Sequence, residues 1–87
     1  LAVTPVTRIG LPDDALFRGL IELLFPDRGL VIPLDALRFM SERLERDYWV
    51  AERAVEAVDR YAIAERARVS LPTIRRALAQ VGLLGAD

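Results

Sequence analysis

Apolar positions recur with helical spacing in four segments of the chain, and each segment is bounded by residues that start or stop helices. The segments cover residues 12–25, 33–44, 47–66 and 70–82. Prolines lie in their first turns or just beyond their ends, and glycines follow the first and the last segment. The pattern therefore predicts four amphipathic helices joined by short turns.

The same spacing predicts which side chains are buried. In the first helix the apolar face comprises Leu16, Phe17, Leu20, Ile21, Leu23 and Leu24. The second helix repeats Leu37, Met40 and Leu44, and the third buries Ala51, Ala54, Val55, Val58 and Ala62. The fourth buries Ile74, Ala77, Leu78 and Val81. Trp49 falls on the polar side of the third helix, where we expect a partner surface to cover it.

Residues 2–9 alternate and are rich in β-branched side chains, which indicates one short strand. A single strand has no partner within this chain. We expect it to pair with another domain or with a second copy, which would allow self-association. The predicted fold class is all-α, a small four-helix bundle preceded by one short β-strand.

The composition excludes most catalytic chemistry. The 87 residues have no Cys and no His, and all twelve basic residues are Arg. Disulfides, thiolate or imidazole metal sites and a histidine base are therefore absent, and we expect neither an enzyme nor a metal protein. No apolar run approaches the ~18 residues of a membrane span, and no leader is visible. We expect a cytoplasmic location, and the Leu at position 1 predicts a piece of a longer protein.

Charge is unevenly distributed along the chain. Residues 1–59 have seven Arg against eleven acids, whereas residues 60–78 have five Arg against one acid. Such a difference can be the chance pattern of a solvated surface, or it can mark a basic tip that binds a nucleotide or a nucleic acid.

Residues 60–84 are similar to a bacterial helix-turn-helix, which implies DNA binding. In that arrangement the fourth helix would be the recognition helix and would expose Thr73, Arg75 and Arg76 to DNA. Arg68 stands at the turn position that usually holds Gly, which departs from the motif.

A broader resemblance covers almost the whole chain. It rests on the sequences at residues 9–16, 28–33, 43–46, 58–62 and 68–72. In this order and spacing they resemble the C-terminal lid subdomain of the DnaA-family AAA+ ATPases, most closely the Hda group that regulates initiation of chromosomal DNA replication. The resemblance assigns residues 1–10 to a strand and linker from a missing AAA+ core. It assigns residues 11–87 to the helical lid.

The resemblance also implies a role. The lid would close over ADP or ATP bound by the core, and the parent protein would contact the initiator DnaA and the sliding clamp. The arginine that senses phosphate in this family corresponds to Trp49, so this sequence departs from the pattern. Arg46 and Arg53 are the candidate substitutes, or they are surface arginines paired with nearby acids (Glu42, Glu45 or Glu56). A third hypothesis is a helical adaptor whose main contact is Trp49.

Overall fold

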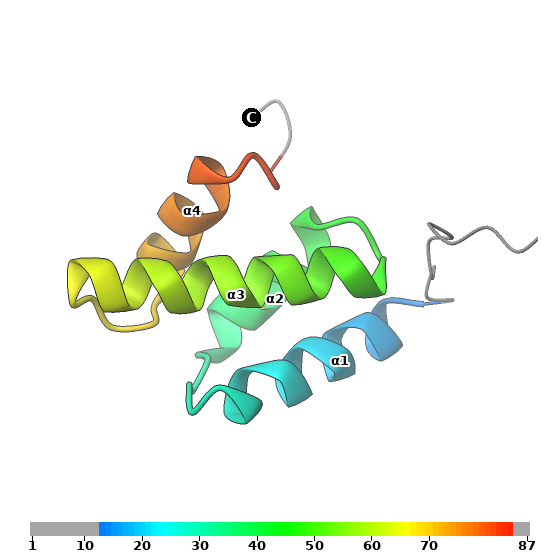
Figure 1. Cartoon of the computed structure of the whole chain (residues 1–87). Helices are drawn as coiled ribbons and strands as arrows, with labels where there is room; N and C mark the ends of the chain where they lie inside the picture. The colour runs from blue at the N-terminus through cyan, green and yellow to red at the C-terminus, as the bar shows by residue number, and fades with distance from the viewer. Residues whose placement is uncertain (1–12, 85–87) are drawn as a thin grey trace, which may run out of the picture.

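The computed structural model describes residues 13–84, which form four α-helices (Figure 1). α1 spans Asp14–Asp27, α2 Leu34–Arg43, α3 Tyr48–Glu65 and α4 Leu71–Gln80. Each helix packs against two others, because α1 and α4 both contact α2 and α3. This arrangement confirms the predicted helical bundle. The predicted strand over residues 2–9 lies outside the described residues.

Three of the helices begin with a side-chain cap. The Asp13 carboxylate accepts a hydrogen bond from the Leu16 amide at 2.8 Å, and the Asp47 carboxylate accepts one from the Trp49 amide at 2.9 Å. The Ser70 hydroxyl accepts one from the Thr73 amide at 3.4 Å. Each cap satisfies amides that have no partner within the helix, so these residues determine where α1, α3 and α4 start.

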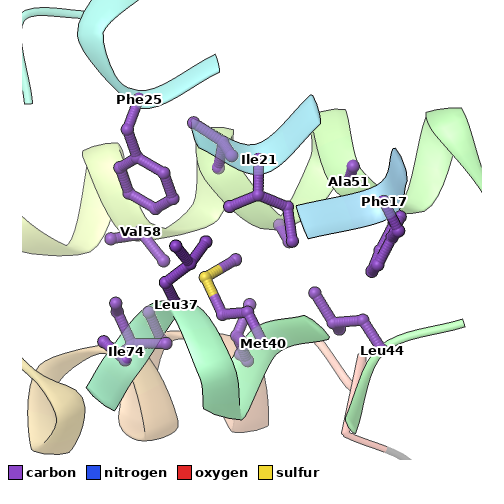
Figure 2. Close-up of a cluster of buried hydrophobic side chains, with 14 residues drawn as sticks. Phe17, Ile21, Phe25, Leu37, Met40, Leu44, Ala51, Val58 and Ile74 are labelled. Atoms are coloured by element: carbon purple, nitrogen blue, oxygen red, sulfur yellow. The ribbon is translucent and has the colours of Figure 1, made fainter. Parts of the chain in front are cut away.

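The core lies between α1, α2 and the inner faces of α3 and α4. The largest fully buried side chains are Phe17, Ile21, Phe25, Met40, Ile74, Leu78, Val55 and Val58. Figure 2 shows the three α1 side chains facing Leu37, Met40 and Leu44 across this core. The predicted stripes of α2 and α3 are all buried, which confirms the helical period read from the sequence.

α1 differs from the prediction in two respects. Its buried stripe is Phe17, Ile21 and Phe25, whereas Leu16 and Leu23 are 51% and 73% exposed. The apolar face is wider than the two neighbouring helices can cover, and the larger aromatic side chains occupy the centre of the contact. The helix also continues through Pro26, so the expected end near Phe25 is wrong. Proline removes one helical hydrogen bond there, but the last turn is exposed and solvent reaches it.

Three helices end in the same backbone arrangement. After α1, the Leu30 amide donates to the Phe25 carbonyl and Gly29 has a φ of 74°. After α4, Gly82 has the same φ and the Leu83 amide donates to the Leu78 carbonyl. Both are Schellman ends, in which a left-handed residue turns the chain back onto the last carbonyls.

The end of α3 uses this arrangement without a glycine. The Ala67 amide donates to the Ala62 carbonyl at 2.9 Å, and Arg66 is the left-handed residue, with a φ of 51°. An L-residue with a Cβ atom is strained in this region of φ and ψ. The tight turn between α3 and α4 therefore forms at some cost in stability.

The end of α4 corrects a further expectation. Val81, predicted to be buried, is 46% exposed because the helix stops at Gln80 and the chain turns away at Gly82. Among residues 13–84, no helix has the length and apolar character needed to cross a membrane.

We predict that Arg66→Gly stabilises the protein by about 0.5–1 kcal/mol, because glycine adopts positive φ without steric strain. The midpoint of urea unfolding, followed by circular dichroism, measures this change. Arg66→Ala is the matched control, since it removes the same charged side chain but keeps the Cβ atom. Equal stability of the Gly and Ala variants would show that backbone strain is not the cause.

Candidate functional site

The candidate nucleotide-facing residues lie at or just before the start of α3, and the structure separates Arg46 from the other two. Arg46 precedes the helix, and its Nη1 atom lies 3.2 Å from Asp14 Oδ1 at the start of α1. Both side chains are exposed, so this ion pair contributes at most about 1 kcal/mol. The pair nevertheless directs the Arg46 guanidinium toward α1 and away from the outer face of α3.

Trp49 is 52% exposed on the outer side of α3, as predicted. Its ring meets the ring of Tyr48 edge to face, with 5.2 Å between the centroids. Edge-to-face contact is a favourable arrangement for two aromatic rings, so Tyr48 holds the indole in place while leaving much of it in solvent. An ordered, exposed indole of this kind is suited to contact with another surface.

Arg53 lies one helical turn after Trp49 and is also exposed. It lines a small pocket of about 140 Å³ together with Glu56, Ala57, Arg60, Val81 and Leu83. Arg60 pairs with Glu56 at 3.0 Å, whereas Arg53 has no ion pair within residues 13–84. The pocket is too small for a nucleoside, since ligand sites typically measure several hundred Å³. This chain could therefore supply an arginine and one wall of a nucleotide site.

The amino end of α3 does not offer a phosphate site. The Asp47 carboxylate is nearly fully buried and accepts hydrogen bonds from the amides of Trp49 and Val50, at 2.9 Å and 3.4 Å. Its negative charge already occupies the positive end of the helix dipole. Any phosphate recognition along this edge must therefore come from a side chain, and Arg53 is the best placed.

An apolar surface lies along α1 and reaches Tyr48, the first residue of α3. Ala15, Leu16, Gly19, Leu20, Leu23 and Tyr48 line a groove of about 410 Å³, which we call the α1 groove. A Cβ atom at Gly19 would meet nothing within 4 Å, so the groove floor is open there. The exposed leucines make it a contiguous apolar patch, and such patches mark contact surfaces in many proteins. Sequence reasoning placed these leucines in the core and so missed the groove.

The alternative DNA-facing residues are not all available. Thr73 is only 8% exposed, and its hydroxyl accepts a hydrogen bond from the Ser70 hydroxyl at 3.1 Å. The expectation that Thr73 is exposed on a recognition helix is therefore wrong, because the residue takes part in capping and packing at the start of α4. Arg75 and Arg76 are exposed, as that hypothesis requires.

Arg75 has a contact that the sequence did not indicate. Its guanidinium carbon lies 5.4 Å from the centroid of the Phe39 ring on α2, and that of Arg43 lies 5.2 Å from the same centroid. The Phe39–Arg43 contact follows from their spacing of four residues on one helix. The Arg75 contact depends on how α2 and α4 pack, which no local pattern reveals.

No group of three or more potential metal ligands occurs among residues 13–84. Comparison of the chain with protein-family models, with curated protein sequences and with solved structures found no match.

Tyr48 provides a pH-sensitive probe of this site. Its hydroxyl donates a hydrogen bond to Glu52 Oε2 at 3.2 Å. This bond, the negative charge of Glu52 and partial desolvation raise the pKa of Tyr48 above its ordinary value of 10.0. The phenol is favoured in the folded state, so its contribution to stability is present below pH 10.0 and is lost as pH rises through the raised pKa.

We predict that Glu52→Gln lowers the pKa of Tyr48 toward its ordinary value, because the substitution removes the carboxylate charge. Tyrosinate absorbance during alkaline titration measures the pKa, and a Tyr61→Phe background leaves Tyr48 as the only tyrosine. Glu56→Gln, one turn further along α3, is the control and should leave the titration unchanged. Identical titrations with and without the Glu52 carboxylate would contradict the assignment.

Proposed function

We propose that this chain is the helical lid subdomain of a DnaA-family AAA+ protein of the Hda type, and that its parent regulates the initiation of chromosomal DNA replication. The resemblance of residues 9–72 to such lids suggests the family. The observations that carry the proposal are the exposed Trp49, Arg53 one helical turn later, and the α1 groove, which Tyr48 also lines. They combine an exposed indole, an arginine with no ion pair in the described residues, and an apolar docking surface.

In this proposal the α1 groove packs against the missing AAA+ core. The groove has exposed leucines at helical spacing, and covering them would remove apolar surface from water. Trp49 lies beside the groove through its contact with Tyr48, so the same docking would cover the indole. A subdomain attached in this way would form one side of the cleft that holds ADP or ATP.

Arg53 is then the residue that meets the phosphates. Trp49 occupies the position where related lids have an arginine, and Arg46 is engaged with Asp14. Arg53 is exposed on the same side as Trp49, and a guanidinium can donate two parallel hydrogen bonds to a phosphate. The proposed nucleotide is ADP or ATP held by the core. DnaA and the sliding clamp are the proposed partners of the parent protein.

We predict that Arg53→Ala, in the protein encoded by the complete reading frame, weakens ATP binding about ten- to a hundredfold. This loss corresponds to one charge-assisted hydrogen-bonding group. Isothermal titration calorimetry with ATP and with ADP measures the effect, which should be larger for ATP if Arg53 contacts the γ-phosphate.

The matched control is Arg38→Ala, which removes an exposed arginine from α2 and should not change nucleotide affinity. Arg46→Ala should have a smaller effect than Arg53→Ala. A full-length protein that binds neither nucleotide would refute the lid proposal. Unchanged affinity in the Arg53 variant would refute the role of that residue.

A further inference from the structure

The carboxyl-terminal part of the chain has positive charge without compensating acids. Residues 66–86 contain four arginines and no Asp or Glu. The four are Arg66, Arg68, Arg75 and Arg76, and all are exposed. None of them has an ion pair within residues 13–84, whereas Arg28, Arg46 and Arg60 each pair with an acid at 3.0–3.2 Å. The turn after α3 and the outer side of α4 therefore carry net positive charge on a chain whose overall charge is −1.

Two of these arginines line one surface depression. Arg75 and Arg76 border a shallow pocket of about 380 Å³ at the start of α4, together with Leu71 and Pro72. Consecutive helical residues point about 100° apart. Both arginines nevertheless line one depression and give it positive charge.

Phe39 restrains Arg75 at the edge of this surface without neutralising its positive charge. The guanidinium groups of Arg75 and Arg43 both lie over its ring, within 5.4 Å of the centroid. The ring is itself packed on the core, which makes it a fixed support. A cation–π contact restrains Arg75 and leaves its hydrogen-bond donors free, unlike an ion pair with a carboxylate. We call the surface formed by Phe39, Arg75 and Arg76 the arginine face.

We propose that the arginine face binds the phosphodiester backbone of nucleic acid without reading base sequence. Arg75 and Arg76 are the phosphate-binding residues, and Phe39 is a positioning residue for Arg75. Several arginines along α4 and the preceding turn fit a polymer with repeating negative charge better than one small anion. The planar guanidinium fork also matches phosphate oxygens. Burial of Thr73 removes the only hydroxyl expected to read bases on α4, so this mode differs from a helix-turn-helix.

This proposal does not rest on the lid function. It uses α4 and the adjacent edge of α2, whereas the proposed core contact uses α1 and the start of α3. A separate experiment on the 87-residue chain therefore tests the nucleic-acid proposal.

The experiment is fluorescence anisotropy of a labelled, random-sequence DNA duplex titrated with protein at several salt concentrations. We expect binding that weakens as salt rises, because counterions are released from the phosphates. Arg75→Gln and Arg76→Gln should each weaken binding and should each lower the slope of log affinity against log salt by about 0.9. Arg18→Gln, an exposed arginine on α1, is the matched control and should leave affinity and slope unchanged.

Phe39→Leu tests the positioning role. It keeps every charge but removes the ring beneath Arg75, so affinity should fall while the salt slope stays the same. Thermal unfolding of each variant verifies that the fold is retained. If Phe39→Leu retains full affinity, the positioning role is excluded.

Three results would overturn the proposal. The first is no salt-dependent binding by the unaltered chain, and the second is undiminished binding by the Arg75→Gln/Arg76→Gln double variant. The third is displacement of the DNA by inorganic phosphate or by polyglutamate as effectively as by unlabelled DNA. Inorganic phosphate would indicate a site for one small anion, and polyglutamate would indicate an acidic protein partner.

Discussion

The burial of Phe17, Ile21 and Phe25 fixes the orientation of α1, and the distribution of exposed surface depends on that orientation. These side chains fill the space between α2 and α3, which are the only helices that α1 contacts in the described chain. Once they are buried, Leu16 and Leu23 must point to the side of the contact, because helical geometry gives them no other direction. The α1 groove is therefore a consequence of core packing. A chain of this size buries only about 60–65% of its surface, so some apolar side chains remain outside.

The turn after α3 determines where the arginines of the carboxyl-terminal part of the chain lie. Arg66 adopts a left-handed conformation where the other two Schellman ends have glycine, and the resulting tight reversal brings α4 back along α3. The reversal also lets α4 pack on α2, which is why Arg75 reaches Phe39. The turn carries the exposed Arg66 and Arg68, and α4 carries the exposed Arg75 and Arg76.

Local patterns in the sequence predicted most of the fold. The helix starts near Asp13, Asp47 and Ser70 and the turns at Gly29 and Gly82 could be predicted, because they depend on interactions between neighbouring residues. Where a predicted burial was wrong, the exposure of the side chain depends on contacts with helices that are distant in the sequence. The exposure of Leu23 depends on which helices lie against α1.

Local sequence patterns were equally limited in predicting the contacts of the candidate site residues. Periodicity alone predicted that Trp49 is exposed, and it is. It could not predict that Arg46 pairs with Asp14, that Thr73 turns inward, or that Phe39 supports Arg75, since each involves packing between helices.

The two proposed surfaces can be occupied together because their main helices, α1 and α4, do not touch in the described chain. α1 and α4 have no direct contact in the described chain, and Figure 1 shows them on different sides of α3. A core docked on the α1 groove and the start of α3 would leave the outer side of α4 in solvent. Coupling between the surfaces would have to pass through α3 or α2, each of which contacts both helices. Of these, α3 carries Arg53 and is followed by the strained Arg66, so in the two proposals it is the helix that would connect a nucleotide at Arg53 with nucleic acid at α4.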